Sequence, residues 1–575
     1  MRALEGVIGA ASANGFTLPH IDYTALLPEL ILIGGALLLL TVGALSFRHL
    51  PTWVYSALSG AIGVASLVAG IVLFEKIQHG HAFTAVANSL AIDGFSTAFV
   101  ILSACIIIVS SLIADGYLRR EGIVGPEFHA LALLGASGAM FMAAANDFIV
   151  IFLGLEIMSI PLYVLAAMDQ RRAESGEAGM KYFVLGAFSS AIFVYGIALT
   201  YGATGSTNLA QISAYLSNNV STNDGLLLAG AALLLVGFLF KVAAVPFHMW
   251  TPDVYQGAPT PATGFMAAIA KVGGFAALLR VFFSTFHSLE VSWQPILWVV
   301  ALLTLVTGAV LGLVQRDVKR MLAYSSINHA GFILLGLQAA STEGISASLY
   351  YVFVYAFLVL GSFAVITIVG GRGDRDHAIE SYRGLGRSQP MLALAFAILL
   401  LAQAGAPFTT GFLGKLYVVE AAVRAHSYAL AVVAMLTGAV AAAFYLRVVF
   451  VMFGGGGASS RDGDDAGAGT DLVPLGVGGV PADRVAVTAA ELDLAPSATS
   501  ALTQFGDASL ATATLLAVPA DAAAEDVGAA EGRSRRLDIA PTTAVGILIT
   551  VGFTVVFGVW PGPLFSFVHA AGLLF

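Results

Sequence analysis

The residues of this sequence best suited to chemistry are five ionisable side chains inside long apolar stretches. They are Glu156, Lys181, Lys241, Lys271 and Lys415. An ionisable side chain inside an apolar span costs about 2.5 to 3.5 kcal/mol on insertion scales and marks a functional site by default. Chains of such groups act as proton relays in pumps and transporters. The spacing therefore predicts the transfer of protons between buried side chains.

Lys241 lies beside a predicted helix break. It closes an apolar run that begins at Leu226, and Pro246 follows it. Proline removes a backbone donor and interrupts a helix. A broken helix at membrane depth is tolerated only where its freed backbone groups are buried in protein or line a water-filled cavity. A charge beside a break therefore indicates a polar path.

Glu156 lies in a span that has no cation within one helical turn of it. A partner must come from another span, and Lys241 is the natural candidate because a carboxylate and an ammonium offset each other's desolvation. We expect the two to act together in proton transfer. A static structural ion pair is the alternative.

Lys271 and Lys415 lie deeper along the same predicted path. Lys271 is about ten residues into its span, near mid-bilayer, without an acidic neighbour on its own helix. Burial without a partner disfavours the charged form, so its protonation should respond to nearby charge. Snorkelling to an interface is the bland alternative. Lys415 follows a second predicted break at Pro407 and stands there roughly as Lys241 stands at the first.

The remaining candidates are less distinctive. Lys181 follows a polar loop and serves equally well as a surface anchor. His329, inside a span, can carry protons near neutral pH, or it is a satisfied structural histidine. His248 and Asp253, at the mouth of the first break, form either a proton inlet or a brace for the Pro-rich turn, and the brace is favoured slightly.

Composition indicates the elements that must position these groups. Hydrophobic residues make up 58% of the 575 residues, charged residues 11%, and the mean hydropathy is +0.88. These values predict an all-α polytopic membrane protein in a lipid bilayer. Fourteen apolar segments are long enough to span a membrane. They are near residues 25–46, 51–74, 94–114, 128–145, 147–168, 179–202, 226–248, 261–285, 293–314, 320–339, 345–370, 389–423, 427–453 and 542–560.

Basic residues predict the orientation. They gather in the connections after odd-numbered spans, which should face the cytoplasm, so both termini should lie outside a bacterial cell membrane. Residues 454–541 form an insertion after span 13, with 13 acidic residues and 5 arginines. We expect it to be a mostly flexible, acidic, cytoplasmic loop. Because the rest of the chain is nearly neutral, no nucleic-acid partner is indicated.

Internal similarity predicts two inverted repeats. The sequence FAALLRVFF at 275–283 resembles AAFYLRVVF at 442–450, and Ala244 to Phe247 resembles Gly405 to Phe408. The matched spans are five apart and therefore run in opposite directions. The predicted parts are N-terminal helices at 1–127, repeats at 128–285 and 286–453 with broken helices 7 and 12, the insertion at 454–541, and a final helix at 542–575. Compositional likeness between apolar segments is the alternative.

Other chemistry is not indicated. The single cysteine, Cys105, excludes disulfides within the chain and cysteine metal sites. The sequence has no metal-ligand cluster, phosphate-binding glycine loop or nucleophile elbow. We expect no cofactor, metal or redox centre in this chain.

Several motifs together carry a family resemblance. FKVAAVP followed by FHMWTPDVYQGAPTP, the segment GLEIMSIPLY, IAKVGGF and RMLAYSSINHAGF resemble the antiporter-like membrane subunits of respiratory complex I. The resemblance spans roughly 25–453 and resumes at the last helix. Within the family the chain is most similar to the subunit N branch of bacterial NADH-quinone oxidoreductase. Subunits L and M usually have alanine and histidine where Val254 and Tyr255 stand, and subunit M usually has glutamate at Lys415.

The resemblance implies a function and partners. It implies a proton-translocating membrane-arm subunit, driven by quinone reduction elsewhere in the complex. Glu156 and Lys241 would be the coupling pair, Lys271 the central carrier and Lys415 the outward carrier. NADH, FMN, iron–sulfur clusters and quinone would belong to other subunits, and neighbours similar to subunits K and M would flank the chain. A subunit of a multisubunit cation/proton antiporter and a non-pumping spacer are the alternatives.

Overall fold

The fold follows the predicted helices closely. The computed structural model describes residues 21–46, 50–219, 225–454 and 537–573. The insertion predicted at 454–541 therefore lies, apart from its edges, outside the described residues. Each of the fourteen predicted apolar segments contains a helix. The first half of the bundle holds α2 (Leu27–Leu45), α3 (Thr52–His79), α4 (Gly94–Glu121), α5 (Glu127–Ala144), α6 (Phe148–Ala166), α7 (Ala173–Thr204), α8 (Leu209–Asn218), α9 (Gly225–Lys241), α10 (Trp250–Gly257) and α11 (Thr260–Arg280).

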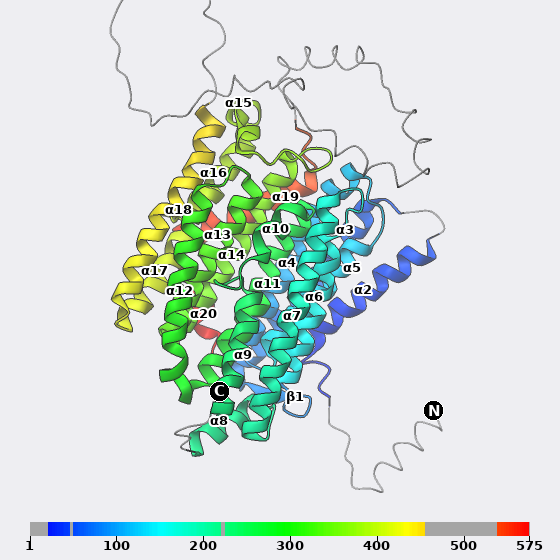
Figure 1. Ribbon diagram of the computed structural model, residues 1–575. Coiled ribbons are helices and arrows are strands. Elements are labelled where there is room, and N and C mark those ends of the chain that lie inside the picture. Colours follow the sequence, from blue (N-terminus) through cyan, green and yellow to red (C-terminus); the bar gives the residue numbers. More distant parts are fainter. Residues whose placement is uncertain (1–20, 47–49, 220–224, 455–536, 574–575) are drawn as a thin grey trace, which may run out of the picture. The chain divides into compact units, whose positions relative to one another are not determined.

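The second half of the chain continues the same bundle (Figure 1). Its helices are α12 (Glu290–Leu313), α13 (Val318–Gln338), α14 (Thr342–Val369), α15 (Leu385–Ser388), α16 (Pro390–Ala404), α17 (Thr410–Arg424), α18 (Tyr428–Gly454), α19 (Pro541–Val559) and α20 (Gly562–Ala570). In the described part, eleven helices are long and apolar enough to cross a membrane, and α9 and α16 are shorter apolar helices. The prediction of an all-α polytopic membrane protein is confirmed.

The sequence pattern did not predict two short strands in the described residues, nor the short helices α8, α10, α15 and α20. β1 (Phe83–Ala85) and β2 (Leu90–Ile92) form an antiparallel hairpin between α3 and α4. Its turn uses left-handed backbone at Val86, Ala87 and Asn88. With only three residues per strand, the alternation of apolar residues is too short to be recognised in an apolar sequence.

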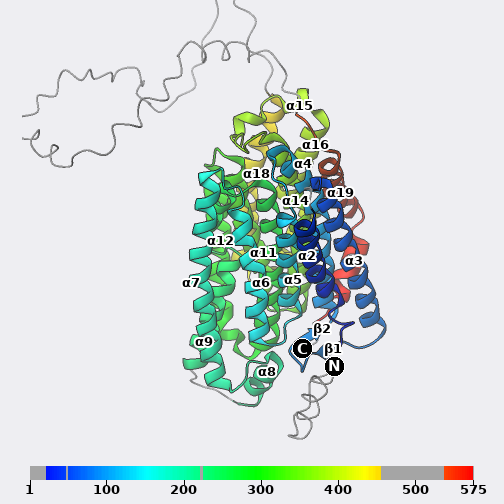
Figure 2. The same cartoon turned by 90° about the vertical axis from the view of Figure 1, so that its right-hand side faces the viewer.

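Helices α11 and α14 form the centre of the bundle (Figures 1 and 2). Their apolar stretches are completely buried within the chain, whereas those of α2, α7 and α19 are only one-third buried. Helix α11 packs against α4, α5 and α14, and α14 packs against α13, α16, α17 and α19. The helix that carries Lys271 is therefore shielded from lipid by other helices.

Both predicted breaks are present, and neither begins at its proline. Helix α9 ends at Lys241, before Pro246, and α16 ends at Ala404, before Pro407. The left-handed residues are Ala243, with φ of 60°, and Gly405, with φ of 92°. Left-handed backbone costs an L-residue about 1 to 2 kcal/mol, so the chain leaves the helix at these residues and the prolines prevent its return.

Each half of the chain contains an isolated β-bridge between residues with the same separation in sequence. Asp147 pairs with Asn208, and Asp317 pairs with Ala378, so both bridges join residues 61 apart in the sequence. Each aspartate also caps the N-terminus of its helix, α6 or α13. The matching geometry supports the predicted repeat independently of apolar composition.

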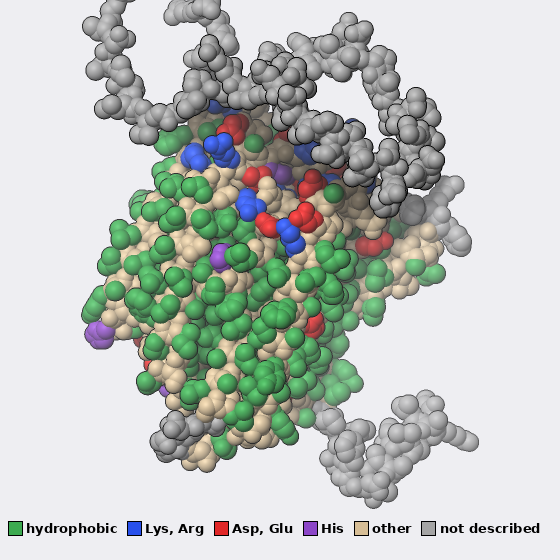
Figure 3. Space-filling model, viewed as in Figure 1, with side chains coloured by type: hydrophobic (Ala, Val, Ile, Leu, Met, Phe, Trp, Pro, Cys, Tyr) green, Lys and Arg blue, Asp and Glu red, His purple; other side chains and the backbone are tan. Residues whose placement is uncertain are grey.

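Charged side chains gather at one end of the bundle. Figure 3 shows apolar side chains over most of the visible face, with blue and red side chains concentrated towards the end where α15 lies. That end, here called the basic end, contains a cavity of about 650 Å³ lined by residues that include Arg171, Arg172, Lys181 and Arg375. The distribution fits the basic connections used to predict orientation.

Candidate functional site

Lys241 is buried at the last position of α9, with 3% of its surface exposed. Its Nζ donates to Ser159 Oγ at 2.8 Å and to Tyr182 OH at 3.4 Å. The Tyr182 ring stacks on Trp250, with centroids 4.4 Å apart. Trp250 Nε1 in turn donates to the Phe240 carbonyl at 3.0 Å. The ammonium therefore faces hydroxyl groups at the point where the helix ends.

Glu156 and Lys241 do not form a direct ion pair, which was the alternative to their acting together in proton transfer. Glu156 Oε1 accepts a hydrogen bond from Ser190 Oγ at 2.5 Å, and no ion pair within 4 Å joins its carboxylate to the Lys241 ammonium. The carboxylate is still near enough to act on Lys241 electrostatically. Each group has a serine hydroxyl as partner, so the separation leaves neither without a hydrogen bond.

Lys271 reaches the first break directly. It is 2% exposed, and its Nζ donates at 2.9 Å to the carbonyl of Val242, the residue that follows Lys241. The same ammonium lies 5.6 Å from the centre of the Tyr355 ring. Val242 lies just beyond α9, where a carbonyl loses its helical partner. The break thus places Lys241 and Lys271 on neighbouring residues of one turn.

Hydroxyl and imidazole groups fill the space beyond Lys271. Tyr355 OH donates to Ser326 Oγ at 2.8 Å. One turn along α13, His329 Nδ1 lies 2.8 Å from Tyr351 OH and its Nε2 lies 3.2 Å from Tyr445 OH. The charges of both Lys271 and Lys415 act on His329. His329 is therefore close enough to both lysines for their charges to affect it.

Lys415 occupies the second break. Its Nζ donates at 2.9 Å to the carbonyl of Ala404, the last residue of α16, and lies 5.0 Å from the centre of the Phe332 ring. The residue is 8% exposed. A helix C-terminus carries partial negative charge on its free carbonyls, so the break supplies a place for the ammonium.

The two breaks are similar in position but not in register. The offset of 162 that aligns Ala243 with Gly405 pairs Lys241 with Gln403. Gln403 is buried and donates to Ser362 Oγ at 2.7 Å. Lys415 instead comes from the helix after the break and reaches back across it. Lys241 and Lys415 are thus equivalent only in lying near a break.

The chain is similar in sequence to proteins of one family. The family profile described as NADH:quinone oxidoreductase/Mrp antiporter, TM, matches residues 145–441. A protein named NADH-quinone oxidoreductase subunit N 3, from Streptomyces griseus subsp. griseus, is 42% identical over 491 residues, covering 78% of this chain and 88% of that protein. The subunit N from Mycobacterium tuberculosis is 40% identical over 483 residues, covering 76% and 90%. The chain belongs to the subunit N family of NADH-quinone oxidoreductases.

Solved structures agree with this assignment. A chain of respiratory complex I from Thermus thermophilus has a TM-score of 0.69 and 28% identity, covering 95% of this chain and 100% of that chain. A chain of the Mrp complex from Dietzia sp. has a TM-score of 0.74 and 20% identity, covering 96% and 97%. The second likeness concerns the fold alone, and it shows that subunit N shares its architecture with antiporter complexes.

The polar residues at the basic end of this subunit N lie apart from the buried lysines. Lys181 pairs with Glu177 at 2.7 Å and with Asp253 at 2.9 Å. Asp253 also pairs with Arg320 at 2.9 Å. The Lys181 side chain is 43% exposed, which favours the surface anchor. His248 lies in the first break, where its Nδ1 has no hydrogen-bond partner among the described residues.

Sequence reasoning missed the hydroxyl groups that lie around the site. They are Ser159, Tyr182, Ser190, Tyr255, Ser325, Ser326, Tyr351, Tyr355 and Tyr445. Serine and tyrosine are unremarkable in membrane helices, where they also join helices to one another. A usable signal was present in α14, because Tyr351 and Tyr355 are one turn apart and face the same side.

No group that could hold a metal ion is found among the described residues of this subunit N. The search covered sets of three or more His, Cys, Asp or Glu side chains. The polar groups around the buried lysines are ammonium, carboxylate, imidazole and hydroxyl groups, all of which exchange protons.

Proposed function

We propose that this chain is a proton-translocating membrane-arm subunit of NADH-quinone oxidoreductase. One series of contacts supports the proposal. Lys271 donates to the carbonyl beside Lys241, and the Tyr355 ring lies 5.6 Å from Lys271 Nζ and 5.3 Å from the His329 ring. On the other side of His329, the Tyr351 ring lies 5.8 Å from it and 5.9 Å from the Phe332 ring, over which Lys415 Nζ lies at 5.0 Å. Three buried amines thus lie along one row of groups that can exchange protons. The side chains are held in place by contacts with one another and with the backbone. Water molecules between them would complete the transfer of protons.

The proposed path follows the order of the row. Protons enter from the cytoplasm near Lys241, pass to Lys271 and then to Lys415, and leave on the outer side. Glu156 tunes the first step through its distance from Lys241. Transport against a membrane potential costs about 2.3 kcal/mol per charge per 100 mV. Quinone reduction elsewhere in the complex supplies that free energy.

The proposal includes location and partners. The chain lies in a bacterial cell membrane with both termini outside and residues 454–541 in the cytoplasm. Neighbours similar to subunits K and M flank it, and NADH, FMN, iron–sulfur clusters and quinone bind to other subunits. This chain carries no redox centre of its own. The two repeats, 128–285 and 286–453, form the two half-channels.

Substitution of Lys271 tests the function. In the purified native complex, Lys271→Ala should slow proton pumping by about 100-fold or more, the contribution of a positioned proton-transfer group. NADH oxidation by an artificial acceptor should not change. Lys76→Ala, which removes an exposed lysine, is the matched control. Normal assembly with normal coupled pumping in Lys271→Ala would favour a structural spacer instead.

An antiporter subunit is the second candidate, favoured by the fold shared with the Dietzia Mrp complex. The two functions differ in their partners. Co-purification with NADH-oxidising, iron–sulfur subunits supports the respiratory complex. Cation-dependent proton exchange by a complex that lacks those subunits would support the antiporter.

A further inference from the structure

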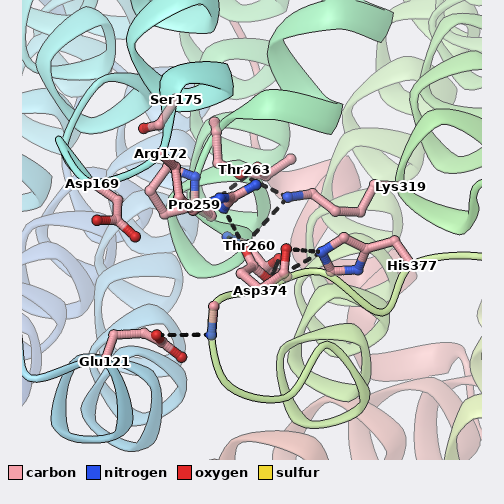
Figure 4. Close-up of polar contacts among 12 residues, drawn as sticks. Glu121, Asp169, Arg172, Ser175, Pro259, Thr260, Thr263, Lys319, Asp374 and His377 are labelled. Atoms are coloured by element: carbon pink, nitrogen blue, oxygen red, sulfur yellow. Dashed lines mark hydrogen bonds and ion pairs between the residues drawn. The ribbon is translucent and has the colours of Figure 1, made fainter. Parts of the chain in front are cut away.

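Asp374 forms a buried ionic cluster at the basic end, apart from the row of lysines (Figure 4). Its carboxylate has no exposed surface. Oδ2 lies 3.0 Å from Arg172 Nη1 and 3.6 Å from Lys319 Nζ, and His377 Nε2 lies 3.1 Å from Oδ1. Left-handed backbone at Gly373 and Asp374, with φ of 76° and 53°, turns the loop after α14. The loop thereby presents the carboxylate to the interior.

The carboxylate holds the start of α11. Thr260, the first residue of that helix, donates its backbone N–H to Oδ2 at 3.0 Å and its Oγ1–H to Oδ1 at 2.6 Å. The first N–H groups of a helix have no partner within the helix, and its N-terminus favours negative charge. Asp374 therefore supplies what this helix end needs, and Lys271 lies eleven residues along the same helix.

Lys319 holds the other side of the same joint. Its Nζ donates at 2.6 Å to the carbonyl of Ala258, the residue that ends α10. The connection between α10 and α11 is thus bound at a carbonyl by Lys319 and at an amide by Asp374, whose side chains also face each other. Both residues are completely buried.

The two halves of the chain meet at this joint. Helices α10 and α11 belong to the first predicted repeat, whereas Lys319 lies in the first turn of α13 and Asp374 follows α14 in the second. Helix α13 carries His329, and α14 carries Tyr351 and Tyr355. The cluster therefore sets the position of the Lys271 helix relative to the two helices that carry the next groups of the row.

We propose that Asp374 is a positioning residue for proton transfer through Lys271. The inference rests on the proposed function. A shift of α11 along its axis would move the Lys271 ammonium away from the Val242 carbonyl and the Tyr355 ring. Misplacement of a reacting group by about 1 Å can cost about 100-fold in rate. The carboxylate fixes that distance from outside the proton path.

The test uses the purified complex with Asp374→Asn, which keeps the side-chain shape and removes the charge. Lys319 and Arg172 then lose their buried partner, and α11 loses its anchor. The number of protons pumped per quinone reduced should fall, while NADH oxidation by an artificial acceptor stays unchanged. Lys319→Met, which releases the Ala258 carbonyl on the other side of the joint, should also lower this number.

Asp115→Asn is the matched control. Asp115 is also buried at the basic end and pairs with Arg119 at 3.2 Å, but it bonds α3 and α19 and not the joint. A purely structural role for Asp374 predicts that both variants lower thermal stability alike and leave protons per quinone unchanged in the assembled complex. That result would overturn the inference.

The outcome for Lys271 separates the two proposals. If Lys271→Ala abolishes pumping and Asp374→Asn pumps normally, the positioning role is wrong and the proposed function stands. If Lys271→Ala pumps normally, the proposed function itself fails. A lower ratio of protons pumped per quinone reduced in both Asp374→Asn and Lys319→Met supports both proposals.

Discussion

Each buried lysine of the row donates to an uncharged oxygen. Lys241 donates to a serine hydroxyl, Lys271 to the Val242 carbonyl and Lys415 to the Ala404 carbonyl. A carboxylate partner would add the attraction of a full opposite charge, which favours the charged form of an amine. Neutral partners thus hold the amines in place while making proton loss easier than a tight ion pair would.

Gly405 offers a test at the scale of one residue. A Cβ there would meet Lys415 Cδ at 3.1 Å, and φ is 92°. Gly405→Ala should cost about 1 to 3 kcal/mol of stability from backbone strain and should slow pumping by displacing Lys415. Gly384→Ala is the control, because its φ is 74° and nothing lies within 4 Å of the added atom. The two variants should have similar unfolding midpoints. Only Gly405→Ala should pump more slowly.

Equal pumping by the Gly405→Ala and Gly384→Ala variants would contradict this account. It would mean that Lys415 tolerates the added methyl group, and that contact with the glycine does not determine where its ammonium lies.

Side-chain roles were less predictable than side-chain positions. The sequence singled out Glu156, Lys241, Lys271 and Lys415 because burial of charge is costly wherever the partners lie. It could not show that Glu156 binds Ser190, because helices α6 and α7 meet only in the folded chain. Asp374 was missed since a loop aspartate in sequence looks like any solvated turn residue.

At the scale of elements, the helices and both breaks were predictable and the exact start of each break was not. Long apolar runs predict spans whatever surrounds them. The first break starts at Lys241 because Ala243 adopts left-handed backbone, which nothing about an alanine predicts. The second has Gly405 at the matching place, where a glycine does predict it.

Helix ends provide a second prediction. Arg280, at the end of α11, makes two hydrogen bonds of 2.9 Å to Asp93, the N-cap of α4, and both side chains are at most 3% exposed. Asp93→Asn leaves Arg280 buried without a carboxylate. The variant should lose about 3 to 5 kcal/mol of stability, measured by thermal unfolding of the solubilised complex.

Glu420 and Arg424 form an exposed ion pair at 2.6 Å on one turn of α17, and this pair is the control for Asp93. Glu420→Gln should cost far less stability than Asp93→Asn, because exposed ion pairs contribute little. Similar losses for the two variants would mean that burial does not strengthen the Arg280 contact.

For the whole molecule, stability should depend on pH through Asp374. Burial raises the pKa of its carboxyl, but the Lys319 ammonium and hydrogen bonds from His377 and Thr260 outweigh burial and hold that pKa well below its usual range. The unfolded chain therefore binds a proton at Asp374 at higher pH than the folded chain does. The stabilisation is present above the unfolded pKa and is lost as pH falls through it and below.

Asp374→Asn should remove this dependence. The difference in unfolding temperature between the parent and variant complexes should be largest at neutral pH and should shrink as pH falls below about 4. A difference that stays constant over this range would mean that Asp374 does not remain ionised in the folded complex at acid pH.

The arrangement of the whole bundle was only partly predictable. The polytopic class follows from composition, but the central place of α11 and α14 does not, because both are as apolar as the helices around them.

The stack of Trp250 on Tyr182 has a practical consequence. Indole emission is sensitive to ring contacts and to the polarity around the ring, and this ring also holds the carbonyl beside Lys241. The chain has four other tryptophans, at positions 53, 293, 298 and 560. Phenylalanine in place of those four would leave Trp250, at the first break, as the one tryptophan of this chain.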